Sequence, residues 1–157
     1  MVTERGMFVT DACRLSLREI TADTVRVICD LEVSEAQEEF VASNAESIAE
    51  AYFCQEAWFR AIYAGDIPVG FVMLHQQPEK GEYYLWRFMI AKDQQGQGYG
   101  KEAMNLIMGH VRTLPKATQL KLSCVPGEGS PEEFYIGLGF KYTGEIEDGE
   151  KIYSIEL

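Results

Sequence analysis

The residues best suited to chemistry lie in a glycine-rich segment past the middle of the chain: Gln95, Gly96, Gln97, Gly98, Tyr99, Gly100 and Lys101. Alternate glycines let a backbone turn tightly and approach a ligand closely. The apolar pattern that follows predicts a helix, whose first N–H groups and positive dipole end would face the loop. The segment therefore favours a binding site for a pyrophosphate.

Two common nucleotide motifs fit this segment poorly. A Rossmann fingerprint keeps two residues between its last two glycines, but only one separates Gly98 from Gly100. A Walker A loop keeps four residues between its glycines, whereas three separate Gly96 from Gly100, and Glu102 rather than Ser or Thr follows Lys101. A plain turn between a strand and a helix remains the structural alternative, although such a turn does not need three glycines.

Tyr135 is a second residue with useful chemistry. The segment before it predicts a helix start, with Ser130 as the cap, Pro131 in the first position and Glu133 closing a capping box. Tyr135 would then lie early in a short helix that ends at Gly139. A phenol with an ordinary pKa of about 10 is protonated at neutral pH and could donate its proton to a departing thiolate. A packing role is the alternative for an isolated tyrosine.

The cysteines and histidines predict no metal site. The sequence has no Cys-x-x-Cys pair and no Cys/His cluster at metal-ligand spacing. The two histidines stand alone, so a Cys-His or Ser-His nucleophile system would need distant residues. We expect the cysteines to be small buried side chains in a reducing cytoplasm. They are Cys13, Cys29, Cys54 and Cys124.

Composition limits the classes of partner. A chain of 157 residues suits one domain, and no apolar run approaches the roughly 18 residues that span a membrane. The amino-terminal segment lacks the apolar core of a secretory signal, so a cytoplasmic location is expected. A formal net charge of −11 argues against nucleic-acid binding and favours cationic small molecules, although solubility alone would also explain it.

Apolar periodicity predicts an alternation of strands and helices. Before the glycine loop we expect a strand over Arg14–Ile20, a helix capped by Asp23, a helical stretch over Ser34–Tyr52 broken near Ser43-Asn44, an antiparallel hairpin of Trp58–Tyr63 and Val69–Leu74, and a central strand over Tyr83–Ile90. After the loop we expect a helix buried through Ala103, Ile107 and Val111, and strands over Gln119–Val125 and Lys151–Leu157. The order predicts a mixed α/β fold.

The glycine segment also resembles a known family. Gln95 to Gly100 matches the Q/R-x-x-G-x-G/A signature of the GNAT superfamily of N-acetyltransferases. Val69-Gly70-Phe71 is similar to the family's preceding strand, and the segment from Phe134 to Phe140 is similar to its F/L-Y-x-x-x-G-F element. The resemblance implies one N-acetyltransferase domain over residues 1–157, with a twisted mixed sheet splayed between its central strands and flanked by helices.

The resemblance implies acetyl-coenzyme A (acetyl-CoA) as co-substrate, without a metal. Main-chain groups of Phe88, Met89 and Ile90 would then contact the pantetheine arm and the acetyl carbonyl. N–H groups from Gly96 to Lys101, in the loop that Gln95 opens, would hold the pyrophosphate. Tyr135 would be the general acid.

Within the family, Tyr83–Phe88 and Val125–Pro131 look most similar to polyamine acetyltransferases, although Trp86 stands where those enzymes often carry an acidic residue. We therefore expect direct acetyl transfer to a primary amine of a small polycation such as spermidine or spermine, with a single-amine metabolite next. A peptide or protein N-acetyltransferase and an acetyl-CoA-binding module without turnover are the alternatives, and a homodimer stays open.

Several carboxylates could surround such a polycation. The acidic side chains expected to border the groove are Glu32, Glu35, Glu38, Glu39, Glu46, Glu50 and Glu56. The general base stays open among Glu82, Glu35, Glu38, Glu39 and an ordered water chain. Trp58, Phe59 and Trp86 are candidates for the channel wall, with core packing as their alternative.

Overall fold

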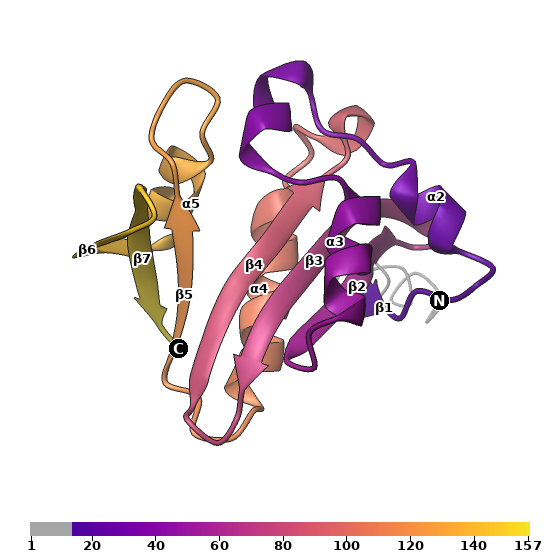
Figure 1. Ribbon diagram of the computed structural model, residues 1–157. Helices are drawn as coiled ribbons and strands as arrows, with labels where there is room; N and C mark the ends of the chain where they lie inside the picture. The colour runs from indigo at the N-terminus through magenta and orange to yellow at the C-terminus, as the bar shows by residue number, and fades with distance from the viewer. Residues whose placement is uncertain (1–13) are drawn as a thin grey trace, which may run out of the picture.

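A seven-stranded mixed sheet organises residues 14–157, the part of the chain that the computed structural model describes (Figure 1). The strands are β1 (Leu15–Arg18), β2 (Ala57–Ala64), β3 (Ile67–Gln77), β4 (Glu82–Ile90), β5 (Gln119–Cys124), β6 (Lys141–Glu147) and β7 (Glu150–Glu156). Their order across the sheet is β1-β2-β3-β4-β5-β7-β6, and only the β4–β5 pair is parallel. The expected mixed α/β class is confirmed.

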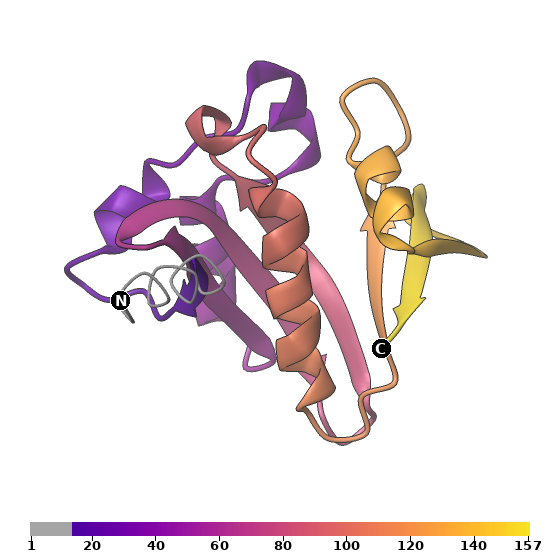
Figure 2. The ribbon, with the colours of Figure 1, turned by 180° about the vertical axis from the view of Figure 1, so that it is seen from behind.

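Helices cover both faces of this sheet (Figures 1 and 2). They are α2 (Val25–Cys29), α3 (Asn44–Tyr52), α4 (Tyr99–Arg112), α5 (Glu132–Leu138) and the 3-10 turns η1 (Glu35–Phe40) and η2 (Lys92–Gln94). One core lies under α4 and α5, where Ala103, Ile107 and Val111 are fully buried, as their spacing predicted. A smaller core lies under α2 and α3 around Phe71 and Met73. In the described part of the chain, no helix is long and apolar enough to cross a membrane.

The hairpin and the broken helix form as expected. Strands β2 and β3 pair antiparallel around Gly65, whose φ of +63° is the left-handed conformation that suits a tight turn. The stretch from Ser34 divides into η1 and α3, and the Ser43 hydroxyl caps α3 by accepting the Glu46 N–H at 3.1 Å. The division turns the chain between the two segments, so that η1 lies near the upper end of β4 while α3 packs on the sheet at β2 (Figure 1).

Strands β4 and β5 separate after a single pairing. Tyr84 and Lys121 are the one pair that joins these strands, and beyond it they diverge toward the end of β4 that leads into the glycine loop (Figure 1). The splay predicted from the family resemblance is confirmed. It leaves the edge of β4 without a neighbouring strand over most of its length, so ladder groups there are available to a ligand.

A β-bulge interrupts β4 beside this splay. Met73 pairs with Arg87 and Leu74 pairs with Leu85, so Trp86 is one residue too many for the ladder. A bulge puts neighbouring side chains on one face of a sheet. Trp86 packs against the core under α2 and α3, and Arg87 reaches α3 on that same face. The bulge therefore directs an aromatic ring and a cation together toward α3.

Two predicted helix caps are wrong. Asp23 does not cap α2, because the helix begins after Thr24, and the chain before it is fixed by Thr21 N–H donating to Thr24 Oγ1 at 2.9 Å. At α5 the cap residue is Pro131, and Ser130 Oγ accepts the Glu132 N–H at 3.2 Å. Ser130 N–H bonds to a loop carbonyl at 3.1 Å, so no Glu133 capping box closes there. The end of α5 at Gly139, with φ of +110°, is as predicted.

Candidate active site

A cavity of about 1000 Å³ opens where β4 and β5 part. Its walls come from η1, the start of α3, β4, the glycine loop, β5 and α5. Of the residues predicted from the sequence, the cavity is lined by Phe88, Met89, Ile90, Gln95, Gly96, Gly98, Gly100, Lys101 and Tyr135. Segments far apart in sequence therefore meet around one space.

Glycine is required in the glycine loop for two reasons: the backbone has positive φ at two positions, and at a third the helix packs closely against α5. Gly96 and Gly98 have φ of +83° and +82°, a left-handed conformation that other residues adopt at a cost. Gly98 is the N-cap of α4, whose first-turn N–H groups have no partners within the helix. At Gly100 a Cβ would lie 3.2 Å from the Phe134 ring, so its absence lets α4 approach α5. A bare helix start of this kind suits a phosphate group.

The exposed edge of β4 offers main-chain groups at alternate residues. Ala91 N–H donates to Val69 O at 2.8 Å, so the antiparallel alternation turns the Met89 groups toward β3 as well. The groups of Phe88 and Ile90 then face the splay. Main-chain contacts to a ligand in the gap are therefore available at Phe88 and at the Ile90 N–H, because Ile90 O accepts from Gln95, whereas Met89 is committed to the ladder.

Gln95 has a structural role that the sequence did not reveal. Its Nε2 donates to Ile90 O and to Gln37 Oε1, each at 2.9 Å. One side chain thus ties the loop to the end of β4 and to η1. The glutamine in the signature holds the loop to the strand edge, in addition to any contact with a ligand.

Gln97 and Tyr99 do not line the cavity. Gln97 O accepts from Arg14 Nη2 at 3.2 Å, and the Arg14 guanidinium lies 4.8 Å from the centre of the Tyr99 ring. Arg14 Nε also donates to Glu102 Oε1 at 2.7 Å. The Tyr99 ring is therefore held by Arg14 on the β1 side of α4, and the Gln97 side chain turns back to the loop, where its Nε2 donates to Gln94 O at 3.4 Å. Main-chain N–H groups remain as their means of contact with a ligand.

Tyr135 reaches the cavity from the face that α4 and α5 cover. Its side chain is 6% exposed, and its ring packs edge-on against Phe134 and Phe140, with centroids 5.2 and 5.6 Å apart. Its hydroxyl makes no hydrogen bond to any of the described residues. Burial raises the pKa of Tyr135 above the ordinary phenol value. The phenol is therefore protonated at neutral pH and can act as a proton donor.

Carboxylates line the opposite side of the cavity. Of the acidic residues expected at the groove, Glu38, Glu39 and Glu46 border it. Glu32 instead pairs with Lys92 at 3.3 Å, and Glu35 and Glu56 lie outside the lining. Glu150, which the sequence did not single out, also lines the cavity. Glu82 does not, because it borders a separate hollow at the other end of β4.

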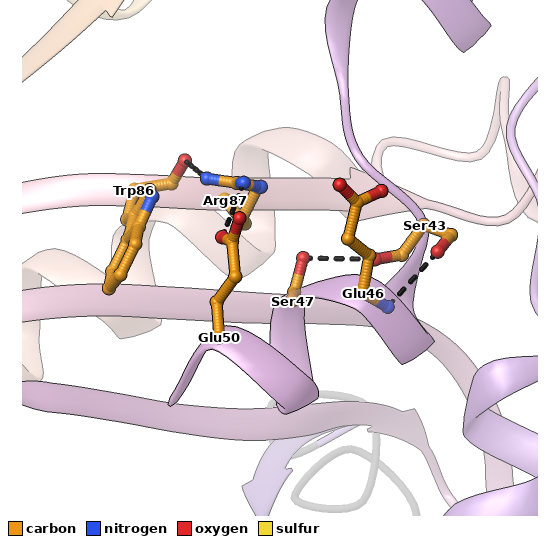
Figure 3. Close-up of polar contacts among 6 residues, drawn as sticks. All are labelled: Ser43, Glu46, Ser47, Glu50, Trp86 and Arg87. Carbon is orange, nitrogen blue, oxygen red and sulfur yellow. Dashed lines mark hydrogen bonds and ion pairs between the residues drawn. The ribbon is translucent and has the colours of Figure 1, made fainter. Parts of the chain in front are cut away.

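An ion pair closes the wall beside the bulge (Figure 3). Arg87 Nη2 lies 2.8 Å from Glu50 Oε1 of α3, and Arg87 Nη1 donates to Trp86 O at 3.4 Å. Arg87 Nε is buried without a hydrogen-bond partner among the described residues. The pair neutralises the charge of a guanidinium that lines the cavity.

Of the three aromatic candidates for the channel wall, only Trp86 lines the cavity. Trp58 stacks on His110 with ring centroids 4.0 Å apart, and Phe59 packs against Phe71 at 5.9 Å. These two residues belong to the cores on either side of β2. The alternative prediction, that Trp58 and Phe59 are packing residues, is therefore correct.

The fold gathers one group of side chains that sequence spacing could not reveal. Ligand atoms of Cys54, Glu56 and His75 lie within 4.8 Å of one another, and Cys54 Sγ lies 3.6 Å from Glu56 Oε1. None of the three lines the cavity. The expectation that acetyl transfer needs no metal stays a prediction. The described cysteines are free thiols, of which Cys124 is buried as expected, whereas Cys29 and Cys54 are only half-buried. Cys13 lies outside the described residues.

Comparison with known families decides the assignment. Residues 23–140 match the Acetyltransferase (GNAT) family. The chain belongs to this family. It is also 30% identical to the "Probable spermine N(1)-acetyltransferase" of Bacillus subtilis subsp. natto, over 91% of this chain and 99% of that protein. The spermine/spermidine N(1)-acetyltransferase of Bacillus subtilis strain 168 is 29% identical with the same coverage. The chain is therefore a GNAT acetyltransferase with relatives named for polyamines.

Solved structures share the GNAT fold. A spermidine N-acetyltransferase chimera from Vibrio cholerae and hSSAT superposes with a TM-score of 0.72 at 18% identity, covering 91% of this chain and 95% of that one. RimL, an α-N-protein acetyltransferase solved with coenzyme A, superposes with a TM-score of 0.72 at 14% identity, covering 92% and 95%. These likenesses establish the fold of the GNAT enzyme described here.

Proposed function

We propose that this GNAT enzyme transfers the acetyl group of acetyl-CoA to a primary amine of a small polycation, with spermidine or spermine as the first substrates to test. The observation that carries the proposal is the cavity through the splay. The cavity extends from the N-terminus of α4 at Gly98, which suits a phosphate group, to a wall of carboxylates on η1 and α3. The polyamine names of the two similar Bacillus proteins support the same substrate class.

The residues present fit acetyl-CoA. The left-handed glycines and the first turn of α4, whose N–H groups have no helical partners, suit its pyrophosphate. The main-chain groups of Phe88 and the N–H of Ile90 suit the amides of pantetheine. Lys101 lies in the same lining and adds a positive charge. When bound there, the co-substrate supplies an acetyl thioester to the gap between β4 and β5.

The cationic substrate would be held by charge on the opposite wall. Glu38, Glu39 and Glu46 are exposed carboxylates in the lining, so they raise the local concentration of a polycation and hold its remote ammonium groups. The Trp86 ring borders the same space and can stack on a cation. A polycation whose remote ammonium groups are held in this way can extend its terminal amine into the gap between β4 and β5.

Tyr135 would complete the reaction by returning a proton. Direct attack of a neutral amine on the thioester carbonyl places negative charge on oxygen, and the Phe88 N–H in the gap can stabilise it. The leaving thiolate then takes the phenolic proton of Tyr135, which burial keeps in place at neutral pH. The cytoplasm, where the free thiols stay reduced, is the proposed location, and size-exclusion chromatography tests whether the enzyme is a homodimer.

Thiol release from acetyl-CoA tests this function. The purified enzyme is assayed with spermidine, spermine, a monoamine, aminoglycosides, amino acids and lysine-containing peptides, each across a range of concentrations. We expect the highest kcat/KM with a polyamine, and we expect added salt to raise the KM for polyamines more than for the monoamine. Efficient acetylation of peptides without turnover of any polyamine would contradict the proposal.

A further inference from the structure

The proton that the substrate amine must lose needs an acceptor, and Tyr135 cannot be that group because it must be protonated for its own role. Ser123 Oγ donates to Glu150 Oε1 at 2.6 Å, and both residues line the cavity. The pairing of β5 with β7 brings them together, since Ser123 lies opposite Ile152 near the start of β7. A hydroxyl with a carboxylate directly behind it is an arrangement suited to proton transfer.

Ser123 and Tyr135 approach the cavity from opposite faces of the sheet. Along β5, Leu122 and Cys124 are buried in the core under α4 and α5, so the alternating side chain of Ser123 points to the other face. Tyr135 belongs to the buried cluster of α4 and α5. One group can therefore serve the incoming amine while the other serves the departing thiolate.

Glu150 differs from the other carboxylates in the cavity wall. Among the described lining residues, Glu38, Glu39 and Glu46 are exposed, whereas Glu150 is half-buried. Exposed carboxylates are suited to attracting a cation, because solvent screens them and they have no fixed partner. Glu150 has a fixed partner in Ser123, so its position relative to the gap is defined.

Tyr84 borders Ser123 at the point where β4 and β5 separate. It is the last residue of β4 paired with β5, and it lines the same cavity. Burial raises the pKa of Tyr84, hydrogen bonding with Ser123 lowers it, and the charges of Glu150 and Glu147 raise it. The net effect is upward, so this phenol stays neutral beside the serine and leaves Glu150 as the proton acceptor.

We propose that Glu150, acting through the Ser123 hydroxyl, accepts the proton that the substrate ammonium group loses before attack. The inference rests on the proposed function and adds the missing base to it. The ammonium N–H bond breaks as its proton passes to Ser123 Oγ, and the hydroxyl proton of Ser123 moves to Glu150 Oε1. The products are a neutral amine, an intact serine and a protonated Glu150, so charge and atoms balance. Ser123 touches the substrate, and Glu150 acts behind it.

The surroundings of Glu150 define the controls. The titratable groups around it include Tyr84 on β4, Cys124 on β5, Glu132 on α5 and Glu147 on β6. Lys151, the next residue on β7, pairs with Glu132 at 3.7 Å. Glu147 is close enough to affect Tyr84 but does not line the cavity. Glu147→Gln therefore removes one nearby negative charge without touching the proposed proton path, which makes it the matched control for Glu150→Gln.

The decisive experiment compares the pH dependence of kcat for wild type, Glu150→Gln and Glu147→Gln with saturating acetyl-CoA and spermidine. Glu150→Gln should lower kcat about 10²-fold at pH 7, the usual scale for a positioned base. Its kcat should then rise with pH, because the fraction of free amine grows toward the ordinary amine pKa of about 10. Glu147→Gln should keep the level and shape of the wild-type profile. Identical profiles for the two variants would overturn the proposal.

Serine variants test the path independently of the carboxylate. Ser123→Ala removes the hydroxyl and should reproduce the Glu150→Gln profile, whereas Ser123→Thr keeps a hydroxyl and should restore the wild-type shape. Wild-type kcat in Ser123→Ala would exclude the serine path. Circular dichroism and acetyl-CoA binding by calorimetry confirm that each variant is folded. If wild type acetylates no amine at all, the proposed function fails, whereas active wild type with unaffected variants refutes the relay alone.

Discussion

Replacing Tyr135 with Phe deletes one hydroxyl from the site and nothing else. The ring is held by Phe134 and Phe140 and is 6% exposed, so phenylalanine can occupy the same space. The hydroxyl makes no hydrogen bond to the described residues, and a typical hydrogen bond contributes only about 0.5–1.5 kcal/mol in net terms. We therefore expect the free energy of unfolding to change by less than about 1 kcal/mol.

Turnover should respond very differently. A positioned general acid contributes about 10²–10⁴-fold, which corresponds to roughly 3–5 kcal/mol of barrier. Burial raises the pKa of Tyr135, so wild type holds this proton across neutral and mildly alkaline pH. The loss of kcat in Tyr135→Phe should therefore be nearly the same from about pH 6 to pH 9. A loss confined to one end of that range would point to another titrating group.

Tyr153 provides a matched control on the same side of the sheet. It is 3% exposed, its hydroxyl donates to Glu132, and it does not line the cavity. Tyr153→Phe leaves Glu132 with Lys151 at 3.7 Å as its remaining ion-pair partner. Because hydrogen bonds to charged groups contribute about 1.5–3 kcal/mol, this variant should lose stability and keep its turnover. The two tyrosines should thus give opposite results.

The assay pairs urea unfolding with thiol release under saturating acetyl-CoA and spermidine. Rapid-mixing experiments must first establish that acetyl transfer, and not product release, limits the rate. Under that condition, wild-type turnover in Tyr135→Phe would make this tyrosine a packing residue. An equal loss of turnover in Tyr153→Phe would also refute the argument, because it would trace the effect to general disturbance of the α5 region.

Three further predictions follow from other parts of the structure. Gly98→Ala and Gly65→Ala both place a Cβ at positive φ and should each cost about 1–2 kcal/mol of stability, but calorimetry should find weaker acetyl-CoA binding only for Gly98→Ala. Glu50→Gln frees the charge of Arg87 beside the cavity, so the KM for spermine should rise by roughly 2- to 5-fold, more than for a monoamine and less in high salt. Burial, then Glu132 and Glu150, raise the pKa of Cys124 from 9.0 to about 12. The thiol of the unfolded chain loses its proton at a lower pH than the buried thiol, so the free energy of unfolding should fall as pH rises above about 9. The urea midpoint should fall less over the same pH range in Cys124→Ala than in wild type.

The parts of the site that sequence predicted are those in which local residues determine local geometry. The glycine loop needs positive φ at Gly96 and Gly98 wherever it lies, and the burial of α4 follows from the spacing of its apolar residues. The central strand β4 was predicted from the nearly continuous apolar and aromatic run over Tyr83–Ile90. These signals lie within a single segment, so one sequence is sufficient to read them.

Strand β6 was missed because it lacks that kind of signal. All seven of its residues are exposed, and it forms the edge of the sheet beside β7. An edge strand with little burial has no reason to alternate apolar and polar residues. The β4 bulge was missed for a related reason, since an extra residue at Trp86 is defined only by the register with β3. Pairings between distant segments create both features.

The same dependence on distant pairing explains why the acidic side of the cavity is hard to assign from sequence. The bulge puts Trp86 and Arg87 in the cavity wall, and the resemblance to polyamine acetyltransferases implies an acidic residue at Trp86. The cation of Arg87 is neutralised by Glu50 of α3 (Figure 3). The exposed carboxylates of the lining come instead from η1 and the start of α3, and β7 adds Glu150, which Ser123 holds. A polycation would therefore be held by segments around the splay, and not by β4 itself. The substrate preference of this enzyme should accordingly respond more to changes at Glu38 and Glu46 than to changes along the central strand.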